Sequence, residues 1–255
     1  MGLGSKLLKF TKQATGIQAI QDKREASEII EKADLMRDNV EQENNRIIAQ
    51  LNSKIEQYQS IQKNVLHNTI GRFREYLKDM NWEKQDNEYG QIDNIAIDKI
   101  IFQSPDTHLQ GKEILKTVAA GVAFGVFAAG YTFSKYYAEK LTQATQYSSK
   151  VKEFKAHSER QWTLINAMIR RTEEQGSTLN EIGRRSEEQL DYLQPLALDF
   201  IPDEIYHTIV VQKNQVFLKP IVEICKTPIV DDLGNLNNKW GKVKAQTSLL
   251  LEKNL

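Results

Sequence analysis

The chain of 255 residues carries 34 basic and 34 acidic side chains, so its formal net charge is zero. The chain as a whole therefore lacks the basic signature of most nucleic-acid-binding proteins, and we expect no nucleic-acid partner. The single cysteine, Cys225, excludes an intramolecular disulfide framework and fits a reducing compartment. All five prolines lie at or after Pro105, which favours long helices over a β fold.

Residues 1–20 predict a basic amphipathic helix. Apolar residues recur in it at helical spacing: Leu3, Leu7, Phe10, Ala14 and Ile17. Lys6, Lys9 and Lys12 lie off that face, and the stretch contains no acidic residue. These lysines are candidate contacts to an anionic membrane surface, although a docked terminal helix would show the same pattern.

Residues 21–80 predict one long helix, because apolar residues recur mostly in steps of three and four between polar side chains. Its length would be on the order of 80 Å. A helix this long cannot bury its apolar stripe alone, so it needs a partner helix or a second copy of the chain. Residues 81–113 follow as a loop and a short apolar cluster at 95–102, and Ser104, Pro105 and Asp106 signal another helix start.

Residues 114–133 predict an apolar helix rich in glycine and alanine, and 117–133 (TVAAGVAFGVFAAGYTF) contain no charged residue. As a helix, 117–133 would cover roughly 25 Å of a bilayer core about 30 Å thick. Gly121, Gly125 and Ala129 recur every fourth residue, a stripe that lets two helix backbones approach closely. Aromatic residues lie within and just beyond the segment: Phe124, Phe127, Tyr131, Phe133, Tyr136 and Tyr137.

The apolar segment has more than one interpretation. Lys135 and Lys140 stand beside the tyrosines, and such an aromatic and basic border is typical of a membrane interface. The lysines would keep the C-terminal side in the cytoplasm, so a permanent span would require export of the charged residues before it, and we expect no signal peptide for this. A permanent span, conditional or oligomeric insertion, and a tightly packed helix in a soluble bundle therefore all stay open.

Residues 134–195 predict a second long helix with a coiled-coil-like rhythm. Many residues of its seam are small or polar, so the pairing should be close but weak: Ala144, Ser148, Thr172, Gly176, Gly183 and Ser186. Because this helix is about as long as the one at 21–80, we expect the two to form an antiparallel pair. Pro195 and Pro202 are expected to end it.

Residues 196–255 predict a small helical subdomain, with a helix from Asp203 to Cys225 interrupted near Pro220, a turn and a short last helix. The turn, KTPIVDDLGNL, resembles the "DTPLLDEDG" ending of an uncharacterised bacterial family of long-helical proteins. The order of elements is also similar: an acidic helix ending in RFREYLKDM, a Gly/Ala-rich stretch and a second coiled-coil-like helix. The resemblance implies no catalytic residues. In layout alone, the chain is loosely similar to α-helical pore-forming proteins.

Motifs for catalysis and cofactors are weak in this sequence. Glu204 and His207 have the spacing of half a carboxylate-bridged di-metal site, but no second such pair occurs. Gly111 and Lys112 lack the frame of a phosphate-binding loop. Cys225 has no histidine next to it in sequence, which favours a buried structural thiol. We expect no catalytic, cofactor-binding or metal-binding residue, no small-molecule substrate and no enzymatic activity.

The sequence thus predicts an all-α fold: an elongated antiparallel helical hairpin, a central apolar helix at 114–133 and a small helical C-terminal subdomain. We expect a cytoplasmic protein that associates with, or inserts into, the inner face of the membrane as an oligomer. Its expected partners are membrane lipid and a second copy or another helical protein. The alternative is a soluble coiled-coil scaffold in which 114–133 is a packed core helix.

Overall fold

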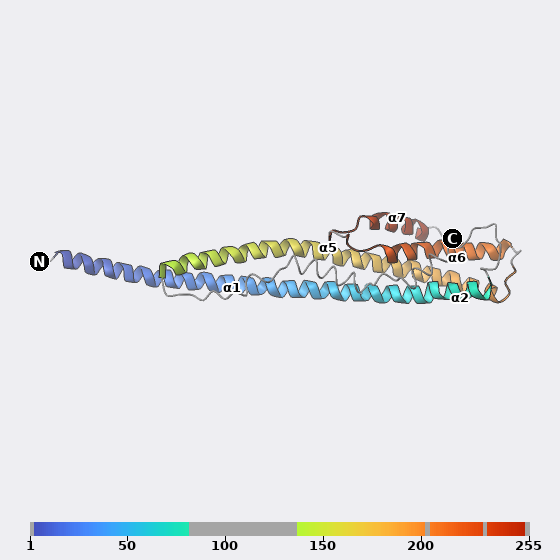
Figure 1. Ribbon diagram of the computed structural model, residues 1–255, viewed down its shortest axis with the longest axis horizontal. Coiled ribbons are helices and arrows are strands. Elements are labelled where there is room, and N and C mark those ends of the chain that lie inside the picture. The colour runs from blue at the N-terminus through green and yellow to red at the C-terminus, as the bar shows by residue number, and fades with distance from the viewer. Residues whose placement is uncertain (1–2, 82–136, 202–204, 232–233, 253–255) are drawn as a thin grey trace. The chain divides into compact units, whose positions relative to one another are not determined.

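The computed structural model describes residues 3–81, 137–201, 205–231 and 234–252, with side chains from Ile20 and Leu141 onward in the first two ranges. Its elements are helices (Figure 1). They are α1 (Leu3–Val65), the π-helix η1 (Leu66–Gly71), α2 (Arg72–Asp79), α5 (Tyr137–Leu198), α6 (Ile205–Lys226) and α7 (Lys239–Glu252). The predicted all-α class is confirmed for these residues.

The long helix predicted at 21–80 extends further toward the N-terminus than expected. α1 begins at Leu3, so the basic stretch 1–20 leads into it without a break in the backbone. After Val65 the π-helix η1 continues into α2, and Val65, Gly71 and Arg72 all keep right-handed helical backbone angles. A π turn inserts an extra residue without ending the helix.

Two predicted breaks at prolines are wrong. α5 continues through Pro195 to Leu198, and α6 continues through Pro220 to Lys226. A proline removes one backbone hydrogen bond and crowds the preceding turn. Pro195 lies in the last turn of α5, where helical bonding is already ending. In α6, Pro220 is buried beside Ile221, and the packing of that face offsets the lost bond.

Unit 1 of the molecule comprises residues 3–49 of α1 and 137–165 of α5. Its buried interface residues recur every seven positions: Ala26, Ala33, Val40 and Ile47 on α1, and Ala144, Val151, Ser158 and Ile165 on α5. Across this interface the Tyr147 hydroxyl donates to Asp34, and the Trp162 indole donates to Asn44. The residue numbers rise together along both helices, so the pair is parallel.

Unit 2 comprises residues 50–81 and the described residues from 166 to 252. Lys54 Nζ lies 2.9 Å from Glu173 Oε1, and Arg72 Nη2 lies 2.9 Å from Asp191 Oδ1. These contacts show that α1 and α2 run parallel to α5 in unit 2 as well, and the colours in Figure 1 show the same direction.

The predicted antiparallel pair is therefore wrong in both units. A rhythm of three and four residues fits either direction of a partner helix, so it carries no information on orientation. An antiparallel pair needs only a short loop, whereas a parallel pair needs a long connection. Residues 82–136, which lie between α2 and α5 in the sequence and outside the described residues, are long enough for one.

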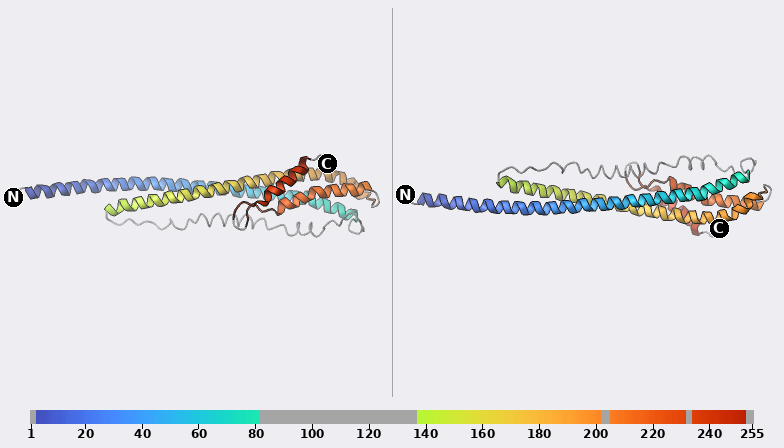
Figure 2. Two further views of the ribbon diagram at one scale, coloured as in Figure 1. Left: turned by 90° about the horizontal axis from the view of Figure 1, so that it is seen from above. Right: turned by 90° about the horizontal axis from the view of Figure 1, so that it is seen from below.

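In unit 2, α6 and α7 pack on the parallel pair (Figure 2). Large buried side chains from every helix of unit 2 form one core: Tyr58, Val65, Ile70, Phe73, Leu77, Leu179, Ile182, Leu190, Leu193, Val211, Leu218, Ile221 and Trp240. The helices of 196–255 therefore share the core of the long helices. Because large apolar side chains bury much more area than alanine, this core is stronger than the interface of unit 1.

Candidate functional site

Most residues of the predicted membrane segment lie in 82–136, outside the described residues: Gly121, Phe124, Gly125, Phe127, Ala129, Tyr131, Phe133, Lys135 and Tyr136. Tyr137 begins α5, and Lys140 lies in its first turn. Lys6, Lys9 and Lys12 lie in the first part of α1. Among the described helices, none combines the length and the apolar character needed to cross a bilayer.

The backbone nevertheless relates the two basic stretches. Asp34 and Tyr147 are in contact, and ten residues earlier on each helix stand Arg24 and Tyr137. Arg24 is therefore level with the start of α5, and residues 6–12 of α1 extend beyond that level. The two predicted basic contacts, at the start of α1 and beside the start of α5, belong to the same end of unit 1.

A half-buried polar cluster links the two helices of unit 1. The Tyr147 hydroxyl donates to Asp34 Oδ1 at 2.6 Å and accepts from Arg37 Nη1 at 3.1 Å. Arg37 also pairs with Asp34 at 3.3 Å and with Asp38 at 2.9 Å. Burial, followed by the hydrogen bond to Asp34, raises the pKa of Tyr147 to about 12. The phenol therefore stays protonated and keeps donating at neutral pH.

A second polar contact lies further along the same interface. The Trp162 indole N–H donates to the Asn44 side-chain oxygen. The Asn44 nitrogen and the Ser158 hydroxyl are buried and have no hydrogen-bond partner among the described residues. Each buried unpaired polar group costs roughly 1–3 kcal/mol. Unpaired buried polar atoms also occur in unit 2, on Gln62, Thr69 and Gln175, so the weaker pairing of unit 1 follows from its small apolar side chains alone.

α5 holds the C-terminal residues of unit 2 through polar contacts. Arg171 donates to the Asn237 carbonyl at 2.8 Å, and the Trp240 indole donates to Glu174 at 3.1 Å. Arg185 donates to the Leu251 carbonyl. Arg171 and Arg185 are visible in the sequence, but their carbonyl partners are not, because each contact joins residues 66 positions apart.

The turn that carries the family resemblance has a defined backbone. Val230 and Leu236 form a bridge, and the Asp231 carboxylate accepts from the Asn235 amide at 2.9 Å. Gly234 has a φ of 81°, a conformation that favours glycine. Asp231 and Gly234 of KTPIVDDLGNL therefore act as turn residues, and this geometry assigns them no chemical role.

Of the candidate metal and thiol residues, His207 and Cys225 are buried in unit 2, and Glu204 lies outside the described residues. His207 is buried, and its Nδ1 accepts from the Ile201 amide at 3.0 Å. No group of three metal-binding side chains occurs in the described part of the chain. Cys225 is 5% exposed, and burial raises its pKa to about 12, although a hydrogen bond with Gln62 opposes this shift. Cys225 is thus the buried thiol that the sequence predicts.

An apolar surface on α6 is a feature that the sequence interpretation missed. Ile205, Ile209 and Val216 are 75%, 43% and 43% exposed and share one side of the helix. Gln212 and Lys219 lie in the same stripe, and we call these five residues the outer face of α6. The sequence contains a signal for this surface, because apolar residues occur on nearly all sides of α6. This distribution is expected of a helix that is covered all round.

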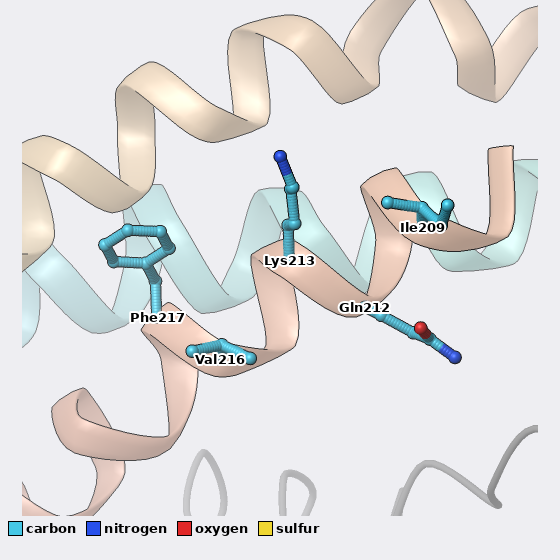
Figure 3. Close-up of a pocket in the computed structure, with 5 residues that line it drawn as sticks. All are labelled: Ile209, Gln212, Lys213, Val216 and Phe217. Atoms are coloured by element: carbon cyan, nitrogen blue, oxygen red, sulfur yellow. The ribbon is translucent and has the colours of Figure 1, made fainter. Parts of the chain in front are cut away.

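A depression of about 240 Å³ lies on this surface (Figure 3). Its described lining residues all come from α6: Ile209, Gln212, Lys213, Val216 and Phe217. It is smaller than the ~300–1,000 Å³ typical of small-molecule pockets. Among the described lining residues, Ile209, Val216 and Phe217 are apolar, and Gln212 and Lys213 are polar.

Comparisons of the chain with protein-family models, curated proteins and solved structures gave no match. The resemblance of KTPIVDDLGNL to the long-helical bacterial family therefore stays a prediction. Function is argued below from the residues alone.

Proposed function

We propose that this is a non-enzymatic helical protein that inserts or docks residues 117–133 at the inner face of the cytoplasmic membrane, as an oligomer. One observation carries the proposal: the pair of unit 1 is parallel, so the start of α1 and the start of α5 belong to the same end. An antiparallel pair would have separated Lys6, Lys9 and Lys12 from Lys135 and Lys140.

Weak pairing in unit 1 favours local opening at the start of α5. The segment joins α5 at Tyr137, and the buried residues nearest this end are Ala26, Ala33 and Ala144. Burying alanine contributes little free energy, whereas the core of unit 2 contains many large side chains. Local opening of a weakly packed part can occur while the stronger core stays folded. The membrane contact can therefore form without unfolding unit 2.

Flotation with liposomes tests this proposal. The wild-type protein should float with vesicles that contain anionic lipid, and Gly125→Asp should abolish flotation, since a carboxylate in the bilayer core is costly. Replacing Lys6, Lys9 and Lys12 by glutamine should weaken binding on the order of a hundredfold, because each lysine near an anionic surface contributes about 1 kcal/mol.

A charge-matched control separates specific contacts from net charge. Glutamine at Lys78, Lys226 and Lys242, which are exposed in unit 2, removes the same charge and should leave flotation unchanged. Wild-type protein that stays in the soluble fraction at every concentration and lipid composition would refute the proposal.

The second candidate function is a soluble coiled-coil scaffold. The polar contacts of Asp34 with Tyr147 and of Asn44 with Trp162 favour it, because buried polar residues set the register in coiled coils. In that case 117–133 would be a tightly packed helix. Gly125→Leu should then reduce oligomerisation or stability without any change in membrane binding, and an unchanged oligomer and melting temperature would exclude this packing role.

A further inference from the structure

We infer that His207 and Ile201 form an acid-sensitive latch, which holds the start of α6 against the end of α5. The inference concerns unit 2 alone and does not rest on the proposed membrane function. It starts from one hydrogen bond, in which the Ile201 amide donates to His207 Nδ1 across 3.0 Å. Ile201 follows the end of α5 at Leu198, and His207 lies in the first turn of α6. The bond therefore joins the ends of two helices.

The direction of this hydrogen bond makes it sensitive to acid. Nδ1 accepts the bond through a lone pair, so that nitrogen carries no proton. A protonated imidazole has an N–H donor on both nitrogens, and the Ile201 amide would then face a second donor. Histidine is the side chain whose charge ordinarily changes between pH 5 and 8. The latch is therefore closed above this range and is lost as the pH falls through it.

Burial decides how the protein responds to the lost bond. His207 is 7% exposed, so water cannot simply take the place of the imidazole acceptor while the turn stays where it is. The Ile201 side chain is 53% exposed, and a small outward movement of this residue brings its amide into water. Val211 and Ile221, further along α6, are 0% exposed and stay in the core. Acid should therefore release the residues around Ile201 without unfolding unit 2.

Two aromatic rings beside His207 tolerate a charged imidazole. The centroid of the Phe200 ring lies 5.7 Å from that of His207, and the centroid of the Tyr206 ring lies 6.2 Å away. A cation about 6 Å from the face of an aromatic ring is attracted to it. The rings thus accommodate protonation, whereas the Ile201 amide opposes it. The contact that changes with pH is the hydrogen bond.

The other charged groups at this end of unit 2 lie on α2, α5 and α6. Arg72 of α2 pairs with Asp191 of α5 at 2.9 Å, so the last turn of α2 is level with the end of α5. The exposed charged side chains of these three helices nearest to the turn are Lys78, Asp79, Asp199 and Lys213. Aspartate, lysine, arginine and tyrosine ordinarily change charge outside pH 5–8. Among the described residues at this end, His207 is the group that titrates in this range.

Hydrogen exchange of the Ile201 amide, measured by NMR on the full-length protein, tests the inference. Its protection, corrected for the intrinsic effect of pH on exchange, should fall about tenfold between pH ~7.5 and pH ~5. His207→Asn places a side-chain oxygen near the position of Nδ1 and cannot be protonated there, so the protection should no longer depend on pH. His67→Asn with His157→Asn is the matched control, because both histidines are exposed, and it should keep the wild-type profile.

Three outcomes would overturn the inference. Equal protection of Ile201 at both pH values in the wild type would show that Nδ1 does not hold the amide. A wild-type profile in His207→Asn would assign the pH dependence to another group. A parallel loss of protection at Val211 and Ile221 would show general acid unfolding instead of a local release. Should His207→Asn not fold, the imidazole ¹⁵N shifts of the wild type serve instead: Nδ1 must become protonated over the same pH range in which Ile201 loses protection, and different midpoints would contradict the latch.

Discussion

Gly183 of α5 lies close to the Val65 side chain of α1. A Cβ at this position would stand 2.8 Å from Val65 Cγ2 and 3.0 Å from Val65 Cγ1. Val65 is buried and β-branched, so it cannot rotate away easily. Gly183→Ala should therefore lower the free energy of unfolding by about 1 kcal/mol, the overpacking cost minus the gain in helix propensity. Urea unfolding measures this.

Gly241 on α7 provides the matched control. Nothing lies within 4 Å of a Cβ built there. Gly241→Ala should raise stability by about 0.5–1 kcal/mol through helix propensity alone. If Gly183→Ala raised the free energy of unfolding as Gly241→Ala does, the close approach of Gly183 to Val65 would be contradicted.

The Cys225 thiol should be unreactive in the folded protein. Burial raises its pKa to about 12, so a thiol reagent at pH 7 should react with it only after addition of denaturant. In the unfolded chain the thiol ionises near its usual value of about 8.5. The unfolded state then binds fewer protons, so stability contributed by this group is complete below pH ~8.5 and is lost between there and pH 12. Cys225→Ala should remove part of the fall in stability at alkaline pH, and an identical pH profile would contradict the assignment.

At the scale of elements, the Tyr147 cluster should stabilise the pairing of α1 with α5 in unit 1. Tyr147→Phe removes the hydrogen bond to Asp34 and should cost about 1 kcal/mol. Hydrogen exchange should then increase in residues 26–47. Tyr192→Phe is the control, because Tyr192 is on the same helix and 68% exposed. Faster exchange in the control alone would disprove the role of Tyr147.

The helices themselves could be predicted from the sequence, because apolar spacing reflects local geometry. The sequence could not predict the relative direction of the two long helices, the continuation of helices through prolines, or the partners of Arg171 and Arg185. Each depends on contacts between residues far apart in the chain, such as Asn44 with Trp162. Pro220 shows the same limit, since the packing that keeps α6 continuous is tertiary. The predicted segment 117–133 lies outside the described residues, so its role stays a prediction.

At the scale of the whole chain, the parallel direction can be tested with four cysteine pairs in unit 2. Lys54→Cys with Glu173→Cys, and Arg72→Cys with Asp191→Cys, should be cross-linked by a short bis-maleimide, because the ends of the native side chains are in contact. The exchanged pairs, position 54 with 191 and position 72 with 173, should not. An antiparallel pair would reverse this result.

The parallel arrangement also affects synthesis of the protein. Partners across the helix pair are separated by 113 to 119 residues, as in Asp34 with Tyr147 and Arg72 with Asp191. At about 5–20 residues per second, a ribosome exposes α1 roughly 6–24 s before the matching part of α5. During that delay the apolar stripe of α1 is without its partner, and neighbouring nascent chains on the same messenger carry an identical stripe. High contact order of this kind slows folding and gives a chaperone, or a second nascent chain, time to bind first.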